Sequence, residues 1–133
     1  MSIRVVRDLT APMRHEIHIG RNSLATDAPL EDGGEGSGPS PHDLFDASLG
    51  ACKAITVLWY AKHKGIPVEG IEVFVERDNS GERAGTYRLS AELSLTGNLS
   101  AAQREELLRV AQKCPVHKLM TQATIEISTT LSP

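Results

Sequence analysis

The chain has 133 residues, of which 40% are hydrophobic and 23% charged, a balance typical of a folded globular protein. Its net charge is −3 and no long basic segment occurs, which argues against a nucleic-acid-binding protein, because such a protein needs clustered Lys or Arg to neutralise phosphates. The length suits one domain, so we expect a single domain over residues 1–133.

No segment has the length and apolar character of a transmembrane helix, and the N-terminal residues lack the apolar core of a signal peptide. We therefore expect a cytoplasmic protein that does not act at a membrane. In that reducing compartment two cysteines are poor candidates for a permanent disulfide. Any pairing between them is expected to be transient and catalytic.

The N-terminal residues 1–28 have the pattern of extended chain. Polar and apolar residues alternate over 15–19, and Gly20-Arg21-Asn22 predicts a turn into a second short strand from Ser23. Residues 31–39 (EDGGEGSGP) are acidic and rich in glycine, but they lack the Gly-Lys-Ser/Thr ending of a nucleotide-binding P-loop. We expect a flexible surface loop there, with a lid over a substrate as its functional variant.

A long helix is predicted next, with clear start and stop signals. Ser40 suits the N-cap, Pro41 the first helical position, and Asp43 falls three residues after the cap, as in a capping box. Gly65 can adopt the left-handed conformation that ends a helix. These signals give about twenty-five residues with Cys52 in the middle. The segment is apolar almost all round, so we expect it to be buried on most faces.

The C-terminal half predicts a hairpin, a second helix and a final strand. Apolar residues alternate over 71–75 and again over 87–95, which indicates an antiparallel pair with one wet face. A capping box at Ser100–Gln103 opens the second helix, and Pro115 is expected to end it. Residues 124–131 alternate once more, as in a strand. The fold class is therefore α+β, with antiparallel sheets, a long buried central helix and a second helix.

Cys52 and Cys114 are the candidate catalytic residues. A reactive cysteine works as its thiolate, so its surroundings must stabilise a negative charge. Cys52 lies in mid-helix, where a cation or hydrogen-bond donor would have to come from another element. Cys114 lies where one helix ends and Pro115 can begin another turn, so backbone N–H groups can point toward its sulfur. A sulfenic acid on one cysteine can be resolved to a disulfide by the other.

Two other uses of these cysteines stay open at this point. Free cysteine is often simply a small buried hydrophobic residue. A metal site is the second alternative, because the spacing of Cys114 and His117 is suggestive and further ligands are present in His42, Asp43, Cys52 and His63. The chain nevertheless lacks the Cys-x-x-Cys and His-x-x-x-His spacings typical of zinc sites, and we expect no bound metal.

Several motifs resemble those of the OsmC/Ohr family. The segments GPSPHDL (38–44) and ASLGAC (47–52) resemble the family's first-cysteine motif, and CPVHK (114–118) resembles its second. GNLS (97–100) is similar to the family's turn into a capped helix. The resemblance runs from about the first strand pair to the C-terminus, and it is closer to the OsmC-like branch.

The resemblance implies an OsmC-like fold in an intertwined homodimer, with two active sites at the dimer interface. It implies that Cys52 is the peroxidatic cysteine and Cys114 the resolving one. Family members reduce organic hydroperoxides, and some also hydrogen peroxide, with a dithiol donor and without haem, flavin or metal. The resemblance therefore implies a thiol-dependent peroxidase that needs no cofactor.

One departure from the family pattern concerns the activation of the thiolate. The family's peroxidases carry a glutamate ten residues before the first cysteine, where it positions an arginine; this chain has His42 there, beside Asp43. Arg14 and Arg21 are the candidates for the arginine. An alternative function is accordingly a protein that binds a small hydrophobic ligand with little or no peroxidase activity. A dimeric domain with inert cysteines is the structural alternative.

Overall fold

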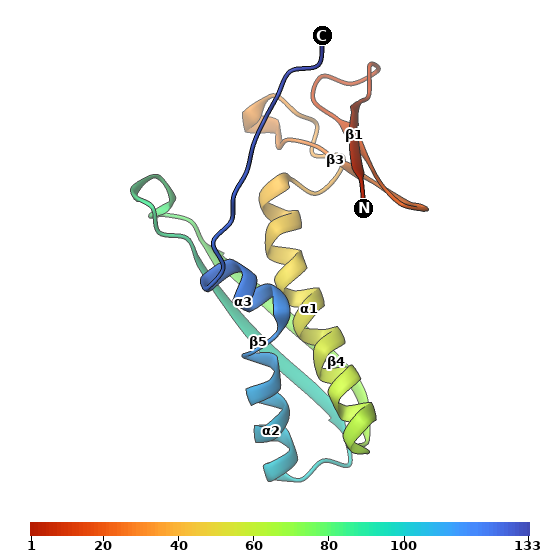
Figure 1. Cartoon of the computed structure of the whole chain (residues 1–133), viewed down its shortest axis with the longest axis vertical. Coiled ribbons are helices and arrows are strands. Elements are labelled where there is room, and N and C mark those ends of the chain that lie inside the picture. The colour runs from red at the N-terminus through yellow and green to blue at the C-terminus, as the bar shows by residue number, and fades with distance from the viewer. The chain divides into compact units, whose positions relative to one another are not determined.

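The computed structural model describes all 133 residues, which form two compact units, Met1–Ala47 and Ser48–Pro133. The single domain expected from the length stays a prediction. The elements follow in the order β1 (Ile3–Arg7), β2 (His15–Ile19), β3 (Asn22–Thr26), η1 (Leu30–Asp32), α1 (Pro41–Lys64), β4 (Val68–Asp78), η2 (Glu82–Ala84), β5 (Arg88–Gly97), α2 (Ala101–Ala111) and α3 (Pro115–Thr121) (Figure 1).

The first unit contains a three-stranded antiparallel sheet in the order β1-β2-β3. Ile17 in the central strand pairs with Val5 on one side and Leu24 on the other. A two-residue turn joins β2 to β3, and its first residue, Gly20, has a φ of +57°, which glycine adopts without steric cost. The extended N-terminal segment predicted from the alternating pattern is confirmed.

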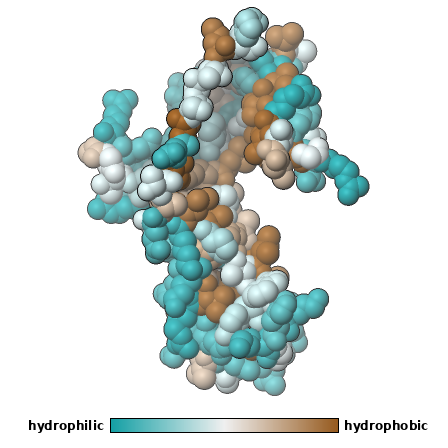
Figure 2. Space-filling model, viewed as in Figure 1, coloured by the Kyte–Doolittle hydropathy of each residue, from teal (hydrophilic) through white to brown (hydrophobic).

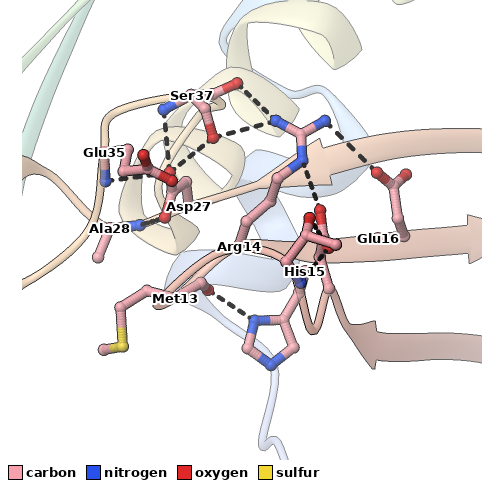
Figure 3. A network of polar contacts seen from close by, with 10 residues as sticks. Met13, Arg14, His15, Glu16, Asp27, Ala28, Glu35 and Ser37 are labelled. Carbon is pink, nitrogen blue, oxygen red and sulfur yellow. Dashed lines mark hydrogen bonds and ion pairs between the residues drawn. The ribbon is translucent and has the colours of Figure 1, made fainter.

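The acidic, glycine-rich loop that follows is organised around one buried carboxylate, Asp27 (Figure 3). Asp27 accepts hydrogen bonds from the backbone N–H groups of Ala28 (2.8 Å), Glu35 (3.2 Å) and Ser37 (3.0 Å), and from the Ser37 hydroxyl (2.6 Å). Arg14 donates to the carbonyl and hydroxyl oxygens of Ser37, both at 3.0 Å. The hydroxyl bond from Ser37, supported by the three N–H groups, lowers the pKa of Asp27 to about 2. These hydrogen bonds hold the loop, which was expected to be flexible, to Asp27 at its start.

Helix α1 begins and ends as predicted. The Ser40 N–H donates to the Asp43 carboxylate at 2.9 Å, and the Asp43 N–H donates to the Ser40 hydroxyl at 3.1 Å, which completes the capping box. The helix runs for 24 residues to Lys64, and Gly65 follows with a φ of +68°. Cys52 therefore lies at mid-helix, as expected.

In the second unit, α1 and α2 pack against one face of the β4–β5 hairpin, in which Val73 pairs with Leu93 (Figure 1). Helix α1 approaches the hairpin closely at Gly50, where a side-chain Cβ would lie 3.0 Å from a methyl group of Val75. The predicted hairpin with alternating faces is confirmed. The core consists of buried residues from both helices and the following turn, namely Val57, Ala61, Ile66, Leu107 and Ala111.

The helix that the sequence predicted before Pro115 ends earlier than expected, and a separate short helix follows it. The capping box of Ser100 and Gln103 opens α2 as expected. However, α2 ends at Ala111, and Cys114 is the N-cap of the separate helix α3, with Pro115 as the first residue. The expectation that Pro115 ends this helix is wrong, since α2 has already ended at Ala111, whereas the expectation that Pro115 can begin another turn is confirmed.

The prediction of a final strand over 124–131 is wrong for the single chain. Residues 123–133 contain no helix or strand, and Ile125, Ile127 and Leu131 are exposed. A strand needs a neighbouring strand to satisfy its N–H and C=O groups, and no strand of the chain pairs with this segment.

The prediction that α1 is buried on most faces is also wrong for the single chain. The side chains of Ile55 and Trp59 are 68% and 61% exposed, and Phe45 and Leu58 are exposed as well. One hairpin and one helix cover only one side of so long a helix, and Figure 2 shows apolar side chains at the surface. None of the three α-helices combines the length and the apolar character that crossing a membrane would require.

Candidate active site

Cys52 is partly exposed on α1, and its sulfur contacts a second helix. The backbone N–H of Val116 donates to Sγ of Cys52 at 3.4 Å. Val116 follows Pro115 in the first turn of α3, where backbone N–H groups have no partner within their own helix. The hydroxyl of Thr56, one turn along α1, lies 3.8 Å from the same sulfur. The donor that Cys52 was expected to need is therefore supplied by the segment after Cys114.

Cys114 has no solvent-accessible surface, and its thiol interacts with that of Cys52. Burial raises the pKa of the Cys114 thiol, and a hydrogen bond with Cys52 raises it further. The backbone N–H of His117 and the charge of Lys53 act in the opposite direction. Both cysteines are free thiols in the structure, and the two sequence motifs meet in one place.

Lys53 is the member of this site that the sequence analysis missed. Its side chain is only 5% exposed, and its Nζ donates to the carbonyl oxygen of Ala111 at 2.8 Å. Nζ also lies 3.1 Å from Nδ1 of His117. A signal was present in the sequence, because Lys53 is the only charged residue between Asp46 and Lys62 in an otherwise apolar stretch.

A cavity of about 180 Å³ adjoins this lysine. Apolar side chains from α1, β5 and α2 form most of its wall, and the polar lining residues are Lys53, Gln112 and His117. Ligand sites are commonly apolar with a few polar groups that fix orientation. The apolar wall includes Leu49, Leu89, Leu93 and Leu108.

The other residues suggested for activating Cys52 belong to the first unit. Arg14 is engaged with Ser37 and also forms ion pairs with Asp8 (3.7 Å) and Glu16 (3.4 Å) (Figure 3). Arg21 is exposed in the turn between β2 and β3, and His42 is exposed in the first turn of α1. A role of any of the three toward Cys52 stays a prediction.

No cluster of three or more His, Cys, Asp or Glu side chains with metal-binding proximity is found in the structure. His117, which was considered as a metal ligand, instead has its Nδ1 in contact with Nζ of Lys53. An ammonium group has only donors, so while Lys53 is charged this nitrogen must be the unprotonated one, and His117 carries its proton at Nε2.

The family model described as OsmC-like protein matches residues 34–130, which include both cysteine motifs. The chain belongs to the OsmC-like family. The resemblance found in the sequence motifs is thereby confirmed, and the α+β fold with antiparallel sheets agrees with solved structures of OsmC-like proteins. No curated protein sequence matches the chain at a significant level.

Solved structures with this OsmC-like fold include an OsmC-like protein from Mycoplasma pneumoniae, at 17% identity and a TM-score of 0.73, with 91% of this chain and 86% of that chain covered. The organic hydroperoxide resistance protein OhrB of Bacillus subtilis is 23% identical with a TM-score of 0.58, over 91% and 90% of the two chains. A protein from Vibrio cholerae O1 biovar eltor, 22% identical with a TM-score of 0.61 over 92% and 85%, holds captopril in one of its active sites.

Proposed function

We propose that this OsmC-like protein is a thiol peroxidase that reduces organic hydroperoxides, with Cys52 as the peroxidatic and Cys114 as the resolving cysteine. The observation that carries the proposal is the pairing of an accessible thiol with a buried one. Cys52 is partly exposed and accepts a hydrogen bond from the Val116 N–H, whereas Cys114 is fully buried and interacts with it. Membership of a family that contains organic hydroperoxide resistance proteins supports it.

The proposed reaction has two steps. The Cys52 thiolate attacks the distal peroxide oxygen, so that an S–O bond forms, the O–O bond breaks, and the alcohol leaves after taking up a proton. Cys114, as its thiolate, then attacks the sulfur of the sulfenic acid; an S–S bond forms, the S–O bond breaks, and the departing hydroxide takes up the Cys114 proton to give water. A dithiol donor returns the disulfide to two thiols. The protein thus transfers two electrons from the dithiol to the peroxide.

Peroxide consumption with a dithiol donor tests this assignment. Cumene hydroperoxide and dithiothreitol are suitable probes for the wild type, Cys52→Ser and Cys114→Ser. We expect Cys52→Ser to lose peroxide reduction, while Cys114→Ser still reduces one equivalent but no longer forms the internal disulfide. Thr56→Val is a matched control, since it replaces the neighbouring hydroxyl with a methyl group and keeps both cysteines, so peroxide reduction should persist. Full activity of Cys52→Ser would show that the assignment is wrong.

We further propose that two copies of the chain form a homodimer. The exposed apolar side chains of α1, including Ile55 and Trp59, and the unpaired segment 124–131 support this proposal, because both features lack a partner within one chain. Sedimentation velocity at micromolar concentration measures the mass directly. A species of 14.4 kDa at all concentrations would contradict the dimer.

A second candidate function is the binding of a small hydrophobic ligand without chemistry. The cavity of about 180 Å³ beside Lys53 favours it, since such a volume is on the scale of a small apolar molecule. Intact-mass measurement after one equivalent of cumene hydroperoxide separates the two functions. Loss of two hydrogens supports the peroxidase, and an unchanged mass supports the binding protein.

A further inference from the structure

Lys53 is a buried lysine with two polar contacts. Its Nζ contacts a carbonyl oxygen and Nδ1 of His117, and within Ser48–Pro133 no ion pair between Lys53 and a carboxylate is found. Taking a charged group out of water is costly unless another charge or several hydrogen bonds compensate it. The position of this lysine therefore calls for a partner that is negatively charged for at least part of the time.

One structural role accounts for part of this geometry. The carbonyl of Ala111 is the last of α2, and a lysine at a helix C-terminus satisfies such a carbonyl and interacts favourably with the helix dipole. An uncharged amide could also donate to that oxygen. Helix capping therefore explains one of the two polar contacts of Lys53, but it does not require a charge.

The buried thiol of Cys114 can become negative within the reach of the Lys53 charge. The titratable groups that bear on Cys114 are Cys52 and Lys53 from α1, and the backbone N–H of His117 from α3 donates a hydrogen bond to it. The β5 residues that line the adjoining cavity, Leu89, Ala91 and Leu93, have no titratable side chain. Among these groups only Lys53 carries a positive charge, and its charge lowers the pKa of the buried Cys114 thiol against the effect of burial.

We propose that Lys53 is a positioning residue that acts as the counter-cation of the Cys114 thiolate, with His117 holding its ammonium group in place. This inference rests on the proposed function in assigning the resolving step to Cys114. When Cys114 releases its proton to attack the Cys52 sulfenic acid, the negative charge forms next to Lys53. Once the S–S bond has formed and hydroxide has left as water, that charge is gone.

The contact with His117 gives Lys53 a defined orientation. While Lys53 is charged, Nδ1 of His117 accepts from its ammonium group at 3.1 Å, and the Ala111 carbonyl accepts at 2.8 Å, so α2 and α3 hold two of its three protons. Both acceptors come from the segment that carries Cys114 between them. The lysine is consequently tied to the resolving cysteine's own loop, although it is adjacent to Cys52 in sequence.

The test measures the Cys114 thiolate in the absence of peroxide. In a Cys52→Ser background, absorbance near 240 nm follows the thiolate of Cys114 as the pH rises, and no reagent has to reach the buried sulfur. Lys53→Gln removes the charge but keeps a donor for the Ala111 carbonyl. We expect the apparent pKa of Cys114 to rise by about one unit, which is about a tenfold lower thiolate fraction at a given pH. Lys53→Arg, which keeps the charge, should restore most of the effect.

Two controls separate charge from folding. Lys62→Met removes an exposed lysine near the end of the same helix and should leave the titration unchanged. Lys53→Met removes both charge and donor; if it unfolds, Lys53→Gln still decides the question. An unchanged titration in folded Lys53→Gln would overturn the proposal and leave helix capping as the role of Lys53.

A second measurement links the counter-cation to turnover. In a single turnover with one equivalent of cumene hydroperoxide, the disulfide should form about tenfold more slowly in Lys53→Gln than in the wild type, in keeping with the lower thiolate fraction. Equal rates would count against the inference. If the wild type fails to reduce peroxide while the titration still depends on Lys53, the proposed function fails and the counter-cation role stands.

Discussion

The backbone N–H of Val116 lies 3.4 Å from Sγ of Cys52, although 64 residues separate them in the sequence. This contact joins the middle of α1 to the first turn of α3. Because Cys114 immediately precedes Pro115 at the start of α3, any shift of that helix changes the donor to one cysteine and the position of the other together. The two cysteine motifs therefore form one structural unit.

The two thiols should differ in reactivity toward a water-borne reagent. Cys114 has no accessible surface and a pKa raised by burial, whereas Cys52 is partly exposed. Each thiol can be labelled alone with iodoacetamide in native protein at pH 8, Cys52 in the Cys114→Ser variant and Cys114 in the Cys52→Ser variant. We expect Cys52 to react at least about tenfold faster than Cys114. Mass spectrometry of the labelled chain gives both rates. Equal rates that become much faster in urea would mean that both thiols are shielded.

Asp27 should make the stability of the first unit depend on pH in acid. Its pKa is lowered from 3.8 to about 2, so its contribution is complete above about pH 4 and is lost as the pH falls toward 2. We expect Asp27→Asn to lower the midpoint of thermal unfolding at pH 7, and the difference from the wild type to shrink between pH 4 and pH 2. Asp32→Asn, on an exposed residue of the same loop, serves as the control. A difference that stays constant over this range would contradict the prediction.

The loop built on Asp27 also depends on a glycine. A Cβ on Gly34 would lie 2.0 Å from the carbonyl oxygen of Ala28, which is backbone and cannot move aside without displacing the loop. We expect Gly34→Ala to open the hydrogen bonds around Asp27 and to speed amide hydrogen exchange at Glu35 and Ser37. Glu35→Ala, which keeps the donating N–H, should exchange as the wild type does. Unchanged protection in Gly34→Ala would show that the close approach is relieved elsewhere.

Adjacent leucines of α2 should contribute very differently to stability. Leu107 is fully buried in the core and Leu108 is 47% exposed. We expect Leu107→Ala to lower the free energy of unfolding by about 2–5 kcal/mol, and Leu108→Ala to lower it by about 1 kcal/mol or less. Urea titrations followed by circular dichroism measure both. Equal losses of free energy would indicate that another molecule buries Leu108 in solution.

Local signals predicted the elements that have local causes. The capping boxes at Ser40 and Ser100 and the left-handed Gly65 depend on residues within one turn of the chain, so their positions followed from the sequence. The alternation over β4 and β5 likewise predicted the hairpin, because the period of a strand is visible in its own residues. The membership of the family was predictable from its two cysteine motifs.

Features that depend on distant partners were not predictable in the same way. The segment 124–131 has the pattern of a strand, but pairing requires a neighbour that the pattern cannot supply. The role of Lys53 was missed because its partners, Ala111 and His117, lie 58 and 64 residues away in the sequence. Only tertiary packing brings such distant residues together. The end of α2 at Ala111 was not predicted either, because Pro115, the residue expected to end it, is the first residue of α3.

The exposed face of α1 provides the protein with an optical reporter. Trp59 is the only tryptophan in the chain and is 61% exposed, so its emission records the environment of that face alone. In an isolated chain the indole stacks on the His63 ring but is mostly in water and emits toward the red, whereas a covering surface would shift the emission to the blue and reduce quenching by iodide. The Trp59 emission, measured while the protein is diluted, therefore reports whether this face of α1 is covered. The measurement needs no added label and works at concentrations too low for sedimentation.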